Sequence, residues 1–240
     1  MVKKLTLIFL LAICTVTSVA QQPPGVHPSY VSIKLRTDTF DTAPETMTMC
    51  GGVVVDERRK LVATGWHCVP NSRSTIEKKD MFFVGEMSAQ LVDYSAEADI
   101  AIFRVDDLKG LKAPRFSTPK KGDIIVASTY YDNYPVLNFP PGSVNKFFPT
   151  MSAKVTLDWE GKVMAVVTAI RRGGEKWDQI TSTNVKWIIV QNGTAPGFSG
   201  GPAFDKSGNF VGISSSGNSG FSNFSSSENI TTMLKELKLK

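Results

Sequence analysis

Histidine and cysteine are scarce in this chain, which has two of the first and three of the second among 240 residues. No group of them is spaced as metal ligands usually are, and no glycine-rich phosphate-binding loop is present. We therefore expect neither a bound metal nor a cofactor. Only His27 and His67 carry an imidazole, so any histidine that acts in catalysis must be one of these two.

The chain also lacks strong charge of either sign, internal repeats and low-complexity segments. Its formal net charge is +5, and the basic residues are spread along the sequence rather than gathered in one block. A nucleic-acid-binding surface usually needs a concentrated basic patch, so we expect no nucleic-acid partner. The remaining composition is that of a globular protein.

The apolar run at the N-terminus, Leu5–Val16, is too short to span a membrane, which takes about 20 residues. Two lysines precede the run, and a small-x-small pattern that ends at Ala20 follows it. This order predicts a signal peptide over residues 1–20, cleaved before Gln21. The protein would then be secreted or periplasmic, with no stable membrane association after cleavage. A retained anchor and a lipid on Cys14 are the alternatives.

Short alternating or apolar segments separated by turn residues predict an all-β protein, built as a sandwich or as barrels. A polar segment over residues 117–123 divides the strands into two sets, and Glu228–Lys238 is the one segment with clear helical periodicity. The predicted strands are Tyr30–Arg36, Gly52–Val55, Leu61–Thr64, Met81–Val84, Ala89–Tyr94, Ile100–Val105, Ile124–Thr129, Ala153–Asp158, Lys162–Ile170, Trp187–Gln191, Gly201–Phe204 and Phe210–Ser214.

One short motif points to chemistry. Residues 197–202 read Gly-Phe-Ser-Gly-Gly-Pro, which puts Ser199 on a tight turn among glycines. Glycine tolerates the backbone angles that such a turn needs. Taken alone, the motif is also compatible with an ordinary glycine-rich turn, so its meaning depends on partners elsewhere in the chain.

Two further segments supply candidate partners for this serine. His67 ends the run Leu61-Val-Ala-Thr-Gly-Trp-His-Cys68, whereas His27 lies in a proline-rich stretch and is interpreted as a solvated loop residue. Asp99 comes directly before the apolar strand Ile100–Val105. It is preferred over Glu97, which lies two residues further from that strand.

Together these segments resemble the chymotrypsin-like (trypsin-like) serine proteases, in which a Cys-Gly-Gly strand, a histidine-cysteine segment, an Asp-Ile-Ala-Leu segment and the serine turn follow in this order. The chain departs from the family at Gly65, where alanine is usual, and has Trp66 at a variable position. The resemblance implies two six-stranded antiparallel β-barrels of the chymotrypsin fold with a C-terminal helix. It assigns residues 21–118 to the first barrel, 119–123 to a linker and 124–240 to the second barrel with the helix.

The resemblance also implies roles for individual residues. Ser199 is the nucleophile, His67 is the general base, and Asp99 is the carboxylate that orients the imidazole and stabilises its protonated form. The backbone N–H groups of Gly197 and Ser199 form the oxyanion hole. The order of histidine, aspartate and serine along the chain is that of the chymotrypsin fold and not of the subtilisin or α/β-hydrolase folds.

The cysteines and the residue before the nucleophile refine this interpretation. By resemblance, Cys50 pairs with Cys68 in a disulfide, which export from the cytoplasm permits. Phe198 stands where zymogen-activated members carry an aspartate that pairs with a freed N-terminus. We therefore expect that no propeptide cleavage is needed, as in bacterial, HtrA-type and viral relatives.

The resemblance further implies a substrate-binding region with two walls. Ser215 would also support the Asp99 carboxylate. Ser216 and Gly217 would pair with the substrate backbone, which would lie beside them as an added strand. The aspartate of Arg/Lys-specific members and the histidine of Glu-specific members are both absent, so we expect a neutral P1 side chain. The implied substrate-binding residues are Gly193, Thr194, Ser214, Ser215, Ser216 and Gly217.

The expected activity is that of a secreted serine endopeptidase that hydrolyses polypeptides through an acyl-enzyme. Two alternatives stay open at this point. One is a catalytically silent relative that binds peptides or partners through the same region, and the other is an esterase on the same scaffold.

Overall fold

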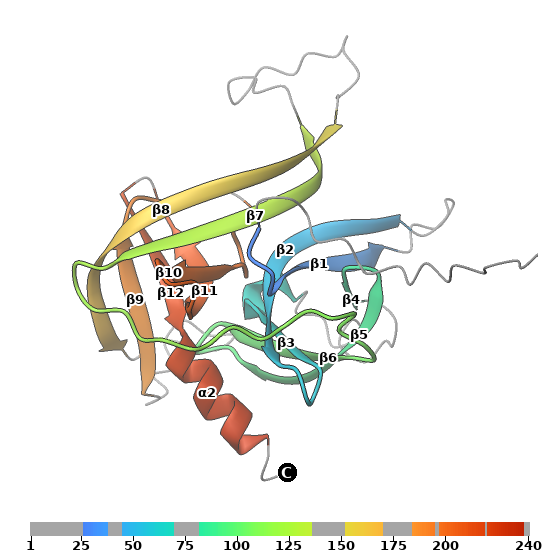
Figure 1. The fold of residues 1–240 in the computed structure, drawn as a ribbon, viewed down its shortest axis with the longest axis horizontal. Helices are drawn as coiled ribbons and strands as arrows, with labels where there is room; N and C mark the ends of the chain where they lie inside the picture. Colours follow the sequence, from blue (N-terminus) through green and yellow to red (C-terminus); the bar gives the residue numbers. More distant parts are fainter. Residues whose placement is uncertain are drawn as a thin grey trace, which may run out of the picture.

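The computed structural model describes residues 26–37, 45–69, 82–135, 152–169, 184–194, 197–218 and 220–237. They form two closed β-barrels and one C-terminal helix, as predicted (Figure 1). The predicted signal peptide, residues 1–20, and Cys14 lie outside the described residues. No helix within the described ranges is long and apolar enough to cross a membrane.

The first barrel contains six antiparallel strands in the order β1-β2-β3-β6-β5-β4. A short 3-10 helix, η1 (Trp66–Cys68), follows the third strand, which is wholly buried and begins with three apolar residues. The strands are β1 (Tyr30–Thr37), β2 (Glu45–Asp56), β3 (Leu61–Thr64), β4 (Phe82–Val84), β5 (Met87–Ser95) and β6 (Ile100–Val105).

The second barrel contains six more strands in the order β10-β11-β12-β9-β8-β7. Helix α2 (Ser227–Glu236) follows the last strand, and the Ser226 side chain caps it by accepting a hydrogen bond from the Glu228 N–H. The strands are β7 (Ile124–Pro135), β8 (Ser152–Ala169), β9 (Val185–Gln191), β10 (Pro202–Asp205), β11 (Phe210–Gly217) and β12 (Phe221–Ser226).

Two strands of the second barrel differ from the sequence prediction. The segments predicted as Ala153–Asp158 and Lys162–Ile170 are one continuous strand, because Gly161 is extended and not part of a turn. A Cβ at Gly161 would lie 2.5 Å from both the Trp159 ring and Val190 Cγ1, so this glycine makes room for packing. Strand β12 was not predicted, since its serines and asparagine lack an apolar pattern.

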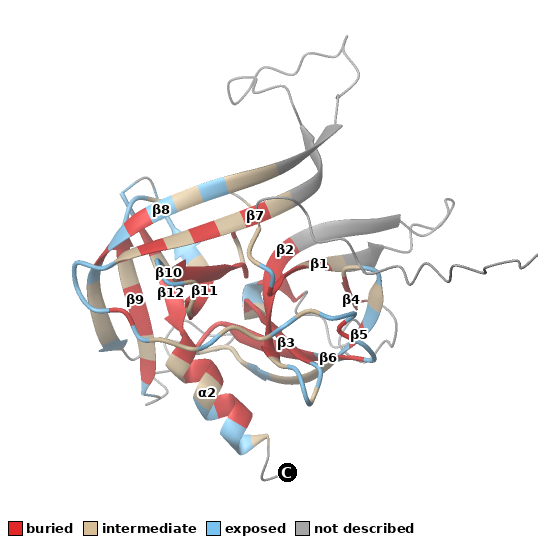
Figure 2. Ribbon diagram, viewed as in Figure 1, coloured by how far each residue is buried: buried red, intermediate tan, exposed pale blue. Residues whose placement is uncertain are grey.

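The core consists of three apolar clusters of buried residues, one of which joins the two barrels. Figure 2 shows the buried residues along the strands of both barrels and along α2. One fills the first barrel and another fills the second. The remaining cluster contains buried residues from both barrels and from α2, including Ile102 of β6, Phe210 of β11 and Ile230 of α2. The faces of β3 and β6 that point away from the first barrel are therefore covered by the second barrel and the helix.

Candidate active site

His67 lies in η1, directly after the buried strand β3. The Cys68 N–H donates to the Gly65 carbonyl and the Val69 N–H donates to the Trp66 carbonyl, which closes the turn. The His67 side chain is 36% exposed. The backbone of the histidine is thus fixed by the turn, while its ring stays accessible to solvent.

Asp99 faces His67 from the turn before β6 and is only 3% exposed. Its carboxylate accepts hydrogen bonds from His67 Nδ1 at 2.8 Å and from the His67 backbone N–H at 2.9 Å. Ser215 Oγ donates a third hydrogen bond to the same carboxylate. Because Nδ1 donates to Asp99, Nε2 of the neutral ring keeps a lone pair that can accept a proton.

The surroundings of Asp99 favour its charged form. Burial raises the pKa of the carboxyl, but the hydrogen bonds from His67 and Ser215 and the charge of protonated His67 outweigh it and hold the pKa below its usual value. Its backbone is left-handed, with φ of +53°, which aspartate tolerates better than most residues. Glu97 lies apart from this group and accepts a hydrogen bond from Ser95 Oγ at 3.3 Å.

The residue before His67 belongs to an aromatic pair. Trp66 stacks on Tyr94 of β5, with ring centroids 4.1 Å apart. Tyr94 is 51% exposed, so the stacked pair reaches the surface beside His67. Tyr94 has no signal in the sequence that marks it as functional, because it is a tyrosine within an ordinary alternating strand.

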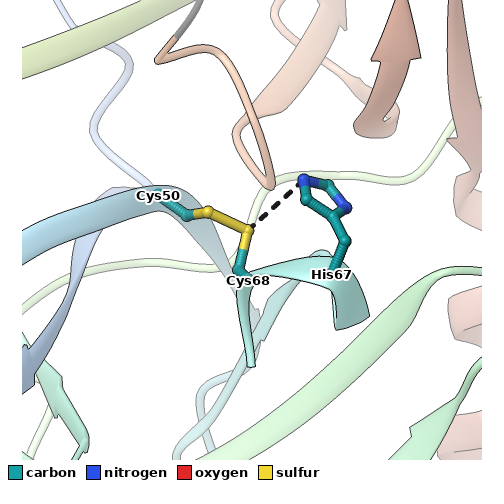
Figure 3. Close-up of side chains that lie close together, drawn as sticks. All are labelled: Cys50, His67 and Cys68. Carbon is teal, nitrogen blue, oxygen red and sulfur yellow. Dashed lines mark hydrogen bonds between the residues drawn. A yellow bond between two sulfur atoms is a disulfide. The ribbon is translucent and has the colours of Figure 1, made fainter. Parts of the chain in front are cut away.

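Cys50 of β2 and Cys68 of η1 form the predicted disulfide, with their Cα atoms 6.2 Å apart (Figure 3). Cys68 Sγ lies 3.6 Å from Nε2 of His67, so the bridge runs beside the ring. The three side chains cluster closely enough to suggest a metal site. The bonded sulfurs, however, cannot supply the thiolates that such a site requires.

Ser199 lies on a turn that contacts the first barrel. The Gly51 N–H of β2 donates to the Ser199 carbonyl at 2.9 Å. Gly200 has φ of +68°, and a Cβ there would lie 2.3 Å from Thr64 Oγ1 and 2.9 Å from Cys68 Sγ. Only glycine permits this approach, so the serine turn packs directly against the disulfide beside the histidine.

The structure therefore brings His67, Asp99 and the Ser199 turn together from three different segments. Among the described residues, no hydrogen bond joins the His67 ring to Ser199, and the contact of Nε2 is with Cys68 Sγ.

Two backbone N–H groups of the serine turn have no hydrogen-bond acceptor among the described residues. The Gly201 N–H donates to the Phe198 carbonyl at 2.9 Å, and in a trans peptide the Ser199 N–H points the opposite way. Gly197 adopts φ of +97°. No described residue accepts a hydrogen bond from the N–H of Gly197 or of Ser199, so both groups can bind an anionic oxygen.

The predicted walls of the substrate-binding region lie next to each other. A Cβ at Gly217 would be 3.2 Å from Thr194 Oγ1. The Thr194 N–H donates to Ser222 Oγ at 2.6 Å, and the Gly193 carbonyl accepts from Trp159 Nε1 at 3.2 Å. Ser222 is fully buried and was missed by the sequence analysis, because it lies in the unpredicted strand β12.

The remaining predicted substrate-binding residues lie along β11. The backbone of Ser214 supports the serine turn, since its carbonyl accepts from the Gly200 N–H and its N–H donates to the Gly201 carbonyl, both at 2.9 Å. Ser214 itself is buried, whereas Ser216 and Gly217 are exposed at the end of the strand.

The interpretation of His27 as a solvated loop residue is wrong. Its ring is half-buried and stacks on Phe204 of β10, with centroids 3.8 Å apart. Nδ1 lies 2.6 Å from Ser29 Oγ, and burial lowers the pKa of His27 despite a backbone contact at Gly208 that raises it. The segment before β1 thus packs on the second barrel, far in the chain from the residues it contacts.

Comparisons with known proteins agree with this fold. The family described as "Trypsin-like peptidase domain" matches residues 50–213. No curated protein is significantly similar in sequence. Among solved structures, the active form of the Rv3671c protease from M. tuberculosis is 16% identical with a TM-score of 0.60, over 88% of this chain and 81% of that one. The HtrA-type protease AlgW, solved with a decapeptide, is 16% identical with a TM-score of 0.57, over 88% of this chain and 64% of its own.

Proposed function

Because the chain belongs to the trypsin-like peptidase family, we propose that it is a serine endopeptidase that cleaves polypeptides through a covalent acyl-enzyme. The catalytic residues of this proposal are His67, Asp99 and Ser199. The observation that carries it is the buried Asp99 carboxylate, which binds both the Nδ1 and the backbone N–H of His67. This arrangement leaves Nε2 as the basic atom of an accessible ring.

The proposed reaction has two halves. Ser199 Oγ attacks the scissile carbonyl carbon while His67 Nε2 takes the hydroxyl proton, and the carbonyl oxygen becomes an oxyanion. The N–H groups of Gly197 and Ser199 stabilise that oxyanion. His67 then gives the proton to the leaving amine as the C–N bond breaks. Water repeats the sequence on the acyl-enzyme and releases Ser199.

Asp99 contributes without exchanging a proton. Its ionised carboxylate keeps the proton of the neutral ring on Nδ1 and stabilises the imidazolium that forms during attack. The hydrogen bond from Ser215 satisfies a further acceptor site of the buried carboxylate. Both contacts hold the histidine ring in one orientation.

The substrate preference proposed here is an uncharged P1 side chain. Gly193 and Ser214 stand at the positions that set charge preference in the family, and neither residue carries a charge. We also propose that the protein acts after export, as a secreted or periplasmic enzyme, in line with the predicted signal peptide. Cleavage of a peptide library tests the first point, and a dominant basic or acidic P1 residue would contradict it.

A fluorophosphonate probe tests the central proposal, because it phosphonylates only an activated serine. The wild type and a Ser207→Ala control, whose serine lies in an exposed turn, should both be labelled. Ser199→Ala should not be labelled. If folded wild-type protein is not labelled by the probe, the proposal is contradicted and a catalytically silent peptide-binding protein is favoured. Labelling together with hydrolysis of esters but not of peptides would favour an esterase.

A further inference from the structure

A line of hydrogen bonds connects the first strand of the protein to the serine turn. The Tyr130 N–H donates to the Tyr30 hydroxyl at 3.2 Å, and the Tyr30 hydroxyl lies 3.3 Å from Thr129 Oγ1. Thr129 Oγ1 in turn donates to the Gly197 carbonyl at 2.8 Å. Tyr30 belongs to β1 of the first barrel and Thr129 to β7 of the second, and each is only 2% exposed.

The direction of each proton in this line is determined. Thr129 has a single hydroxyl proton, which goes to the Gly197 carbonyl because a carbonyl can only accept. The Tyr30 hydroxyl must therefore be the donor in its contact with Thr129. Its oxygen accepts from the Tyr130 N–H. Both hydroxyl groups thus donate in the direction of the serine turn. Hydrogen bonds in such an ordered chain strengthen one another.

The tether ends at the residue whose N–H is proposed to bind the oxyanion. Gly197 has φ of +97°, and as a glycine it has wide backbone freedom of its own. Fixing its carbonyl fixes the plane of the peptide that joins it to Phe198. The Gly197 N–H lies in the preceding peptide, so the tether acts on that N–H indirectly, by holding the Gly197 Cα at which the two peptide planes meet. The next carbonyl, that of Phe198, is held by the Gly201 N–H, and the carbonyl after it, that of Ser199, by the Gly51 N–H.

The side chain of Phe198 anchors the turn from within. It is buried in the apolar cluster of the second barrel. A phenylalanine has no charge, so it anchors the turn by packing and not by an ion pair. The turn is therefore held by apolar packing at Phe198 and by the hydroxyl of Thr129, and both anchors are present in the uncleaved fold.

We propose that Thr129 and Tyr30 are positioning residues that hold Gly197 so that its N–H points at the oxyanion. The inference rests on the proposed function and adds the means by which the hole forms without an activation cleavage. The barrels do not depend on the two hydroxyls, since β7 is held by its ladder to β8 and β1 by its ladders to β2 and β4. Loss of the Thr129 and Tyr30 hydroxyls should therefore affect catalysis more than folding.

The test compares Thr129→Val, which removes the hydroxyl at nearly constant shape, with Thr129→Ser, which restores it. Thr168→Val is the matched control, because Thr168 lies exposed on β8. Since deleting a whole oxyanion donor costs about 100- to 1,000-fold in kcat, misplacing one should cost Thr129→Val about 10- to 100-fold. KM should stay within about twofold, because the interaction is made in the transition state. Tyr30→Phe should lower kcat by a smaller factor.

The fluorophosphonate labelling rate gives a second readout, since phosphonylation also builds negative charge in the oxyanion hole. It should fall in Thr129→Val and recover in Thr129→Ser. A Thr129→Val enzyme with wild-type kcat and labelling rate would overturn the inference, as would a change confined to KM or to the melting temperature. If Thr129→Val does not fold, Tyr30→Phe decides, and an unchanged kcat there also overturns it. Wild-type protein without activity would instead count against the proposed function.

Discussion

Removing the Cys50–Cys68 disulfide should destabilise the protein by an amount that its geometry defines. The bridge joins residues 18 apart in the sequence. In the chain-entropy model, closing a loop of this length stabilises the folded state by about 3 kcal/mol at 25 °C. Both cysteines are buried in the core cluster of the first barrel, so substitution by alanine adds a smaller loss of packing.

Calorimetry and urea denaturation of a Cys50→Ala/Cys68→Ala variant measure this loss. For a chain of this size, each kcal/mol shifts the melting temperature by about 2–4 °C, so the expected fall is about 6–12 °C. Each single variant also lacks the bridge and should lose a similar amount, since the two effects are not additive. Activity at a temperature where the variant stays folded should fall as well, because Cys68 follows His67 directly.

The outcome that refutes this reasoning is specific. A double variant whose free energy of unfolding lies within about 1 kcal/mol of wild type would show that the bridge does not constrain the unfolded chain as the model requires. Two free thiols found by mass spectrometry on the unreduced wild type would refute the bridge itself.

Three further results are expected. Asp99→Asn should lower kcat by about 10,000-fold, because the amide favours the wrong tautomer of His67, and a drop below tenfold in steady-state assays would contradict the role of Asp99. Gly200→Ala should cost at least about 2 kcal/mol in urea denaturation, since a left-handed alanine is strained and its Cβ would meet Thr64 Oγ1 at 2.3 Å. The lowered pKa of His27 means that the unfolded chain binds more protons, so stability should fall as the pH drops below about 6.5. His27→Phe keeps an aromatic ring on Phe204 and should flatten that part of the stability–pH curve, whereas an unchanged curve would exclude His27 as its source.

The parts of the fold that the sequence predicted are those with local signals. β3 and β6 are mainly apolar runs, and the helix near Ile230 follows a simple periodic pattern. The helix ends two residues earlier than predicted, at Glu236. β12 was not predicted, because its pairing with β9 and β11, and not its own sequence, makes it a strand.

The residues of the candidate site likewise divide into those with a local signal in the sequence and those without one. His67, Asp99 and Ser199 stand in short motifs that the sequence shows directly, and the disulfide was expected from the family resemblance of the Cys50 strand and the His67-Cys68 segment. Ser222 and Thr129 gave no such signal, because their importance comes from partners about 30 and 70 residues away. His27 was misread because nothing in a proline-rich stretch indicates that Phe204 lies beneath it.

The apolar cluster shared by the two barrels has a consequence for how the protein unfolds. It contains Ile102 of the first barrel, Phe210 of the second and Ile230 of the helix, so neither barrel can lose its structure without exposing the apolar surface of the other. We therefore expect one cooperative transition, with equal calorimetric and van 't Hoff enthalpies, in place of two separate domain transitions. The histidine and the serine would then be lost together, and no partly unfolded form would keep half of the site.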